Sequence, residues 1–477
     1  MSETELDTGS KHPWWRYASN SSFQITATVI GATQAIYLYY FYFNVLGLEP
    51  GLIVLALTIF TIYDAINDPI IGFLVDRNTR LTKRWGRRFP WIVIGIVPWT
   101  LSLFLIFTAP TVNPANPWPV FFWLFGSLIL MDTFGTLVGI NVSALRPDLF
   151  RTEKERQKLT WWWTPLDMIA QALGFILPPL FINPSALKAS YGLMGTMMSI
   201  ICLISAVLFL PGTTETKVVK ERYFTGKYES FSFFSGMKEV LKSKSFIVFF
   251  ITLTAFNMTI NLLMGNAPFV NTFLLRYAAG DEVIIFVIFM VGAFIAFPFW
   301  ILYLKKVKNN KKVLAIGGLA LGITLFPLSF FQTEIDLYIM LFILGVAMGS
   351  MWAFFYTIIQ ASVIDDFVAS TRKNQKGILL GVSTLLGRLV ATLDEGVMAL
   401  VHTTTGFPAG SEDYAGLVTA VNAAGGDVNL VLLGIRLLFG IIPSIVIIVG
   451  TLVFWKYFPL TQDKVLENKR ILEELGF

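Results

Sequence analysis

Two aspartates four residues apart stand inside an apolar stretch, in the segment YDAINDPIIGFLVDRNTRLTKRWGRRFPW of residues 63–91. On a helix this spacing puts the carboxylates of Asp64 and Asp68 on one face, with Cβ atoms roughly 6 Å apart. Two like charges so close resist ionising together. Such a pair is satisfied by sharing a proton or by holding a small hard cation through its oxygens. The spacing therefore predicts a site for Na⁺ or H⁺, to which Asn67 adds an amide oxygen.

Further charges follow at comparable depth in other apolar stretches. Asp132 stands about 14 residues into its stretch, and Arg388 is near the centre of another. Intramembrane charges are costly and usually mark ion or substrate pathways. We expect Arg388 to be the counter-charge when no cation is bound. The alternative interpretation is structural, with Asp64 and Asp68 permanently paired to Arg388 or capping a helix break.

The residue types argue against an enzyme. The chain has two histidines, His12 and His402, and one cysteine, Cys202. These are too few to favour a catalytic histidine or a His-based metal site. A channel is the other competing class, but no repeated filter segment is present. We expect no cofactor other than the coupling ion, and a small-molecule substrate moved without chemical change.

The elements that must position these charges are membrane-crossing helices. Of the 477 residues 55% are hydrophobic and 14% are charged, whereas ordinary soluble domains are nearer 25% charged. Stretches of about 20 apolar residues, each long enough to span a bilayer, recur along the chain. The twelve predicted spans are 22–46, 51–75, 90–108, 118–145, 161–182, 191–210, 246–275, 283–304, 313–331, 337–364, 377–403 and 429–457.

The basic residues predict the orientation of these spans. With twelve spans both termini share one side. On that side lie 32 of the 36 Lys and Arg residues, if Lys456 at the inner end of the last span is included. By the positive-inside rule the termini are cytoplasmic. The net charge of +5 is then a topology signal and does not indicate a nucleic-acid partner. We expect a multi-pass protein of the cell membrane that acts as a monomer.

A long polar segment predicts the domain organisation. Residues 211–245 form a central loop between an N-terminal half (1–210) and a C-terminal half (246–460), with a cytoplasmic tail at 461–477. The basic loop after span two has a weaker counterpart, LKKVKNNKKV, after span eight. Two six-helix halves define the major-facilitator architecture, an all-α fold with its substrate site near mid-membrane at their interface.

Polar and aromatic residues in the spans are candidates to line a cavity. They include Thr28, Thr164, Trp352 and Tyr356. An aromatic residue at this depth is more often packing than a sugar-stacking platform. The triplet Trp161–Trp163 lies at the start of span five, where tryptophan is expected as an interface anchor.

The segment from YDAINDPIIGFLVD to RRFPWIVIG resembles the span-two signature of the glycoside–pentoside–hexuronide:cation symporters, the melibiose carrier family. LMD at Asp132, SVIDDF at 362–367 and the tail YFPLTQDKV are similar too. The resemblance implies that Asp64, Asn67 and Asp68 form a cation site with Thr384. It places Arg388 where a lysine neutralises the empty site.

The resemblance also implies a substrate site and a gate. Asp132 matches an aspartate shared by the sugar and cation sites. We expect the substrate-binding set to be Thr28, Asp132, Thr136, Thr164, Trp352, Tyr356 and Arg388. Asp76, Arg77, Arg87 and Arg88 resemble the cytoplasmic gate motif, whose charge pairs at helix ends break as the halves move.

Three departures concern the sugar side of this pattern. Thr28, Thr136 and Thr164 replace an aspartate, a tryptophan and an arginine, respectively. A fourth departure is on the cation side, where Ile129 replaces a threonine. We expect cation-coupled symport of a sugar or glycoside by alternating access. The alternative is transport of a lysophospholipid or another amphiphile, because the related lysophospholipid carriers share the span-two aspartates.

Overall fold

The regular secondary structure of the described residues is helical. This computed structural model describes residues 12–75, 85–150, 152–216, 233–307, 309–354, 359–372, 378–379, 381–383, 386–387 and 392–474. Within these ranges, the only β feature is an isolated bridge between Asn113 and Asn116. The predicted all-α class is confirmed. The residues form two compact units, 1–228 and 229–477.

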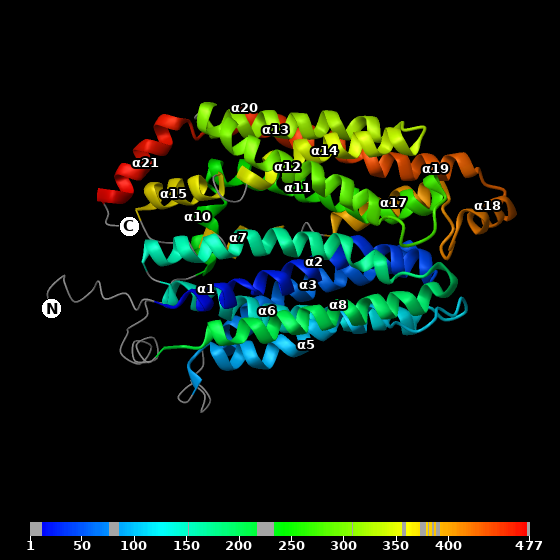
Figure 1. The fold of residues 1–477 in the computed structure, drawn as a ribbon, viewed down its shortest axis with the longest axis horizontal. Helices are drawn as coiled ribbons and strands as arrows, with labels where there is room; N and C mark the ends of the chain where they lie inside the picture. Colours follow the sequence, from blue (N-terminus) through cyan, green and yellow to red (C-terminus); the bar gives the residue numbers. More distant parts are fainter. Residues whose placement is uncertain are drawn as a thin grey trace. The chain divides into compact units, whose positions relative to one another are not determined.

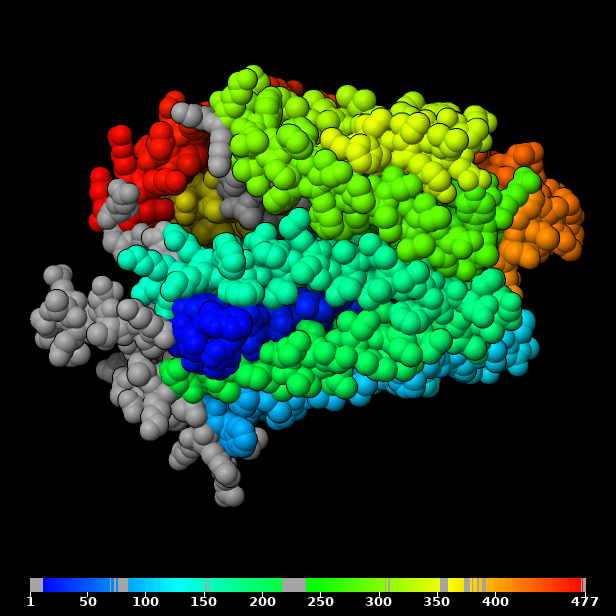
Figure 2. Space-filling view, viewed as in Figure 1, coloured from blue at the N-terminus to red at the C-terminus, as the bar shows by residue number. Residues whose placement is uncertain are grey.

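The first unit is a bundle of long helices (Figure 1). In it α2 packs on α7 and α8, α5 packs on α6 and α8, and α3 packs on α6. Figure 2 shows the N-terminal helices, in blue, between α7 and α8. Its helices are α1 (Trp14–Ser21), α2 (Phe23–Tyr40), α3 (Pro50–Val75), α5 (Phe89–Phe107), α6 (Trp118–Leu149), α7 (Glu153–Ile176) and α8 (Leu187–Phe209).

The second unit contains α10 (Phe233–Val240), α11 (Lys244–Phe269), α12 (Val283–Val307), α13 (Asn310–Leu325), α14 (Glu334–Phe354), α15 (Gln360–Thr371), α17 (Leu393–Thr405), α18 (Tyr414–Ala423), α19 (Val428–Arg436), α20 (Ile442–Tyr457) and α21 (Gln462–Glu474). Here α12 packs on α14, and α20 packs on α11 and α13. A Cβ at Gly345 of α14 would collide with the Phe289 carbonyl oxygen of α12. This glycine is therefore required by the close approach of the two helices.

Ten helical segments in the described residues are long and apolar enough to cross a membrane. They correspond to ten of the twelve predicted spans. Predicted span 22–46 is helical as well, as α2 followed by a π-helix at Phe41–Val45, but its threonines, glutamines and tyrosines make it less apolar. Predicted span 377–403 falls partly outside the described residues, and α17 lies at its end. The count of twelve, the orientation and the boundaries at 210 and 246 stay predictions.

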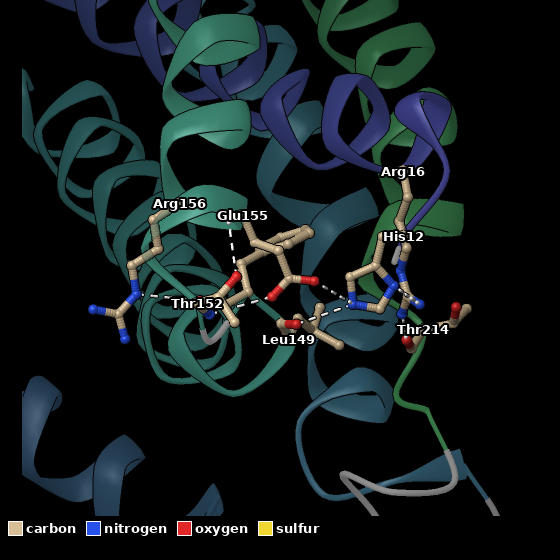
Figure 3. A network of polar contacts seen from close by, with 8 residues as sticks. His12, Arg16, Leu149, Thr152, Glu155, Arg156 and Thr214 are labelled. Atoms are coloured by element: carbon tan, nitrogen blue, oxygen red, sulfur yellow. Dashed lines mark hydrogen bonds and ion pairs between the residues drawn. The ribbon is translucent and has the colours of Figure 1, made fainter. Parts of the chain in front are cut away.

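A polar network fixes the N-terminal segment to the rest of the first unit (Figure 3). His12 Nε2 lies 3.0 Å from the Leu149 carbonyl oxygen and 3.9 Å from Glu155 Oε1. Arg16 contacts His12 Nδ1 at 3.2 Å and also donates to the Thr214 carbonyl oxygen. The segment before α1 thus contacts the end of α6 and the start of α7, and α1 contacts the residues that follow α8.

Candidate functional site

The packing of α3 against α6 brings the predicted cation residues next to Asp132. Asp64, Asn67 and Asp68 follow one another over little more than one turn of α3, and Asp132 lies within α6. The i, i+4 spacing of the two aspartates is realised because α3 is a continuous helix through this stretch. Asp64 and Asn67 are buried, with 5% and 6% of their surfaces exposed.

Hydrogen bonds connect these side chains across the two helices. Asn67 Nδ2 donates to Asp132 Oδ2 at 2.9 Å. The Thr136 hydroxyl donates to Asp68 Oδ1 at 2.9 Å and lies 3.5 Å from Asp132 Oδ1. A hydroxyl carries a single proton, so the shorter contact to Asp68 is the dominant bond. Asp68, Thr136, Asp132 and Asn67 therefore form one continuous network, which we call the α3–α6 network.

Two members of this site were missed in the sequence. Tyr63 donates from its hydroxyl to Asn67 Oδ1 at 3.3 Å and lies 2.6 Å from Thr133 Oγ1. Thr133 in turn donates to the Ile129 carbonyl oxygen at 2.7 Å. The i, i+4 spacing of Tyr63 and Asn67 was a usable signal, because it places both on one face of a helix. The contact between Tyr63 and Thr133 joins residues 70 positions apart, so no local spacing in the sequence could indicate it.

The remaining predicted substrate residues of the first unit lie on other helices. Thr28 of α2 donates to Asp167 Oδ1 of α7 at 3.0 Å, and Gln24 Nε2 donates to the same oxygen at 3.1 Å. Thr164 is an exposed residue of α7. No contact that the structure describes joins Thr28 or Thr164 to the α3–α6 network. Asp167 and Gln24 were not predicted as site residues.

Several predicted site residues lie outside the described part of the chain. They are Asp76 and Arg77 of the gate, Thr384 of the cation site, and Tyr356 and Arg388 of the substrate set. The backbone of Trp352 belongs to α14, but its side chain is outside the described part as well. Their roles stay predictions.

The two described gate residues lie where α5 begins. The backbone N–H groups of Arg87, Arg88 and Phe89 donate to the Glu215 carboxylate at 3.0, 2.6 and 3.1 Å. The side chain of Arg88 donates from Nη1 to Asn141 Oδ1 of α6 at 3.4 Å. The basic segment before α5 is therefore anchored to the residues that follow α8.

The α3–α6 network has the donor types that suit a small monovalent cation. Two carboxylates, an amide oxygen and a hydroxyl are hard oxygen ligands of the kind that alkali and alkaline-earth ions prefer. Within the described residues, no group of three His, Cys, Asp or Glu side chains is arranged to hold a metal.

Fold and site together define a polytopic membrane transporter of the major facilitator type. Among solved structures, the nucleoside transporter NupG matches with a TM-score of 0.59 at 15% identity, covering 94% of this chain and 100% of that one. The xylose transporter XylE from E. coli matches with a TM-score of 0.56 at 14% identity, over 96% of this chain and 98% of that one. These neighbours share the fold.

The chain belongs to the MFS/sugar transport protein family, whose model matches residues 19–462. Among curated relatives, the sodium-dependent lysophosphatidylcholine symporter 1-B of Danio rerio is 25% identical, over 95% of this chain and 87% of the relative. The lactose permease of Lactobacillus delbrueckii subsp. bulgaricus is 23% identical, over 86% of this chain and 64% of the relative. These relatives are transporters, not enzymes. The match is to the broader family, and the narrower melibiose-carrier relationship stays a prediction.

Proposed function

We propose that this protein is a sodium-coupled symporter whose ion site is formed by Asp64, Asn67 and Asp68, completed by Thr384. The observation that carries the proposal is the α3–α6 network, in which carboxylates on two membrane-crossing helices are linked by Asn67 and Thr136. Several relatives are sodium-dependent symporters, which supports Na⁺ over H⁺.

Coupling follows from the position of Asn67 in this proposal. Its amide nitrogen donates to Asp132 Oδ2. Its amide oxygen, which accepts from Tyr63 in this structure, is the ligand that we propose for the ion. An ion bound at Asp64 and Asp68 offsets their charge and draws the Asn67 oxygen, which orients Asp132 for the substrate. Binding free energies are reciprocal, so sodium raises substrate affinity by the factor by which substrate raises sodium affinity.

The cargo that we propose is a sugar or glycoside, bound through hydroxyl groups at Asp132. It is supported by the matched family and by the lactose permease relative. A second candidate is a lysophospholipid, which is favoured by symporters of lysophosphatidylcholine that cover 94–95% of this chain. The gate roles of Asp76, Arg77, Arg87 and Arg88 and a monomeric state are part of the same proposal.

Substitution of Asp68 by Asn tests the ion site. In purified protein, sodium should raise the unfolding midpoint of the wild type, since a ligand of the native state stabilises it by RT ln(1 + [L]/Kd). Asp68→Asn should show no sodium-dependent shift and no sodium-driven uptake in vesicles. Asp336→Asn, an exposed residue at the start of α14, is the matched control. Full sodium-driven uptake by Asp68→Asn would overturn the proposal.

A further inference from the structure

A carboxylate on α7 lies outside the α3–α6 network and has its own partners. One oxygen of Asp167, Oδ1, accepts from Gln24 Nε2 at 3.1 Å and from the Thr28 hydroxyl at 3.0 Å. Both donors are on α2, which packs along α7. These two bonds hold the carboxylate in one orientation across the α2–α7 seam.

A carboxylate at the position of Asp167 costs free energy unless it has a polar partner. Asp167 is near the middle of Lys154–Phe181, a segment long and apolar enough to cross the membrane. Its donors are neutral, and no cationic side chain of the described residues makes an ion pair with it. A carboxylate in a membrane segment faces a polar path or a partner rather than lipid. Asp167 is partly exposed, and the two hydrogen bonds that it accepts both end on Oδ1, which leaves Oδ2 to such a partner.

Neighbouring residues extend the polar surface around Asp167. Thr164, an exposed residue, is three positions earlier on α7, a spacing that puts both side chains on one helix face. Asp167 itself can only accept hydrogen bonds while ionised, and Gln24 and Thr28 have already directed their donors at Oδ1. The group that Oδ2 selects is therefore a hydrogen-bond donor.

We propose that Asp167, oriented by Gln24 and Thr28, is a second substrate-binding residue that accepts a hydrogen bond from an alcohol hydroxyl of the cargo. The inference rests on the proposed symport function and deepens it. Both candidate cargoes carry such a group: sugars have several, and a lysophospholipid has one on its glycerol. A quaternary ammonium has no hydrogen to donate, so the choline group is not the ligand here.

Asp167→Asn is the decisive variant. It keeps an acceptor at the position held by Gln24 and Thr28 and places an NH₂ donor where Oδ2 was. A hydrogen bond to a charged group contributes about 1.5–3 kcal/mol to binding. The dissociation constants of lactose and of lysophosphatidylcholine are measured separately. For whichever of the two is the true cargo, the constant should rise about 10-fold to 100-fold in the variant. The sodium-induced shift of the unfolding midpoint should stay as in the wild type. Unchanged cargo affinity in Asp167→Asn overturns the inference.

Two further measurements separate binding from structure. Asp366→Asn alters a carboxylate whose two oxygens are held by Ser245 and Asn468; it should lower the unfolding midpoint without changing cargo affinity. Blocking the glycerol hydroxyl of lysophosphatidylcholine as a methyl ether, or removing single hydroxyls of lactose, should weaken binding to the wild type but not to Asp167→Asn. If Asp167→Asn does not fold, Thr28→Val should weaken the cargo affinity several-fold, and an unchanged affinity overturns the inference.

The outcomes distinguish this inference from the function on which it rests. A wild type that binds neither lactose nor lysophosphatidylcholine overturns the proposed cargoes and this inference together. A wild type that binds one of them with sodium dependence, alongside an Asp167→Asn variant of equal affinity, overturns this inference alone. The binding probe identifies whether the hydroxyl comes from a sugar or from a lipid.

Discussion

In the proposed mechanism, Asn67 connects the paired aspartates of α3 to Asp132 of α6. Its side chain has one acceptor and one donor end, and the structure directs the donor end to Asp132 Oδ2 at 2.9 Å. The acceptor end faces Tyr63 at 3.3 Å, a longer bond that an ion can displace. A buried amide used at both ends can connect the groups on either side of it.

Asn67→Ala should uncouple sodium from substrate. The variant lacks both the oxygen proposed to bind the ion and the nitrogen that donates to Asp132, so sodium should change substrate affinity less than twofold. Coupling between two sites typically amounts to 5-fold to 150-fold. The measurement is substrate affinity in sodium and in potassium at equal ionic strength. Tyr63→Phe is the control, because it removes only the hydroxyl and should retain the sodium effect; Asn67→Ala with wild-type coupling would contradict this role.

The sequence predicted this site unevenly, and spacing explains the difference. Asp64, Asn67 and Asp68 were recognisable because one helix turn brings them together by local geometry alone. The bonds from Thr28 and Gln24 to Asp167 join residues separated by about 140 positions. Only the packing of α2 on α7 creates them, so Thr28 was identified as a site residue while its acidic partner was not.

At the scale of elements, the start of α5 depends on a carboxylate from elsewhere in the chain. The first N–H groups of a helix have no intrahelical partners. Here the N–H group of Phe89, the first residue of α5, and those of the two preceding residues, Arg87 and Arg88, converge on Glu215. Gly86 precedes them with φ of +104°, and a Cβ there would collide with the Glu215 carboxylate. The end of the basic segment that precedes α5 is therefore held in place by Glu215.

Glu215→Gln should destabilise the first unit by about 1–3 kcal/mol, because one carboxylate oxygen becomes an NH₂ donor facing backbone donors. The check is thermal unfolding of the purified protein, in which the variant midpoint should fall. Glu467→Gln is the matched control: Glu467 is exposed and pairs with Lys464 at 3.0 Å on the surface, where such pairs contribute little. Equal midpoints for wild type and Glu215→Gln would show that the cap does not stabilise the fold.

The attachment of the N-terminal segment should depend on pH through His12. Burial, and to a smaller degree the adjacent Arg16 charge, lower the pKa of His12 from its ordinary value of 6.5, although Leu149 and Glu155 act in the opposite direction. Arg16 directs a donor at Nδ1, so the bound imidazole is neutral. In the unfolded chain His12 takes up a proton at higher pH than in the folded one. Stability should therefore fall as pH drops below about 6.5.

Unfolding midpoints measured between pH 5 and 8 test this dependence. His12→Asn removes the titrating group and should flatten the lower part of the profile relative to the wild type. Parallel profiles for the two proteins would show that another group causes any loss of stability in acid.

One element pattern in the two units supports a duplicated architecture. The helix α2 ends in a π-helix at Phe41–Val45, and α11 ends in one at Val270–Leu275. Each lies at the end of the first predicted span of its half and contains a buried asparagine, Asn44 or Asn271. π-Turns have no reliable sequence signature, which is why the repeat was visible in the sequence only as two basic loops.

For the whole molecule, length and apolarity carried most of the fold prediction. The described apolar helices coincide with predicted spans, because the thickness of a bilayer sets a minimum apolar length that is easily found in a sequence. Predicted span 22–46 showed the limit of that criterion, since α2 carries polar residues that contact neighbouring helices, such as Thr26 donating to the Cys202 carbonyl oxygen. Polar contacts inside a bundle lower hydropathy without removing the helix.

The basic residues predict that both termini face the cytoplasm, and single cysteines can test this. Cys202 is buried, and a Cys202→Ala background keeps a small apolar side chain there and leaves no native thiol. In it, Lys242→Cys, in the turn before α11, should be protected from a membrane-impermeant maleimide in intact cells and labelled after permeabilisation. Glu412→Cys, an exposed position between α17 and α18, should be labelled in intact cells. The positive-inside rule predicts that the loop with Lys242 and the loop with Glu412 face opposite sides of the membrane. Labelling of Lys242→Cys from outside would show that the orientation is the reverse of the predicted one, with the Arg87–Arg88 segment on the outer face.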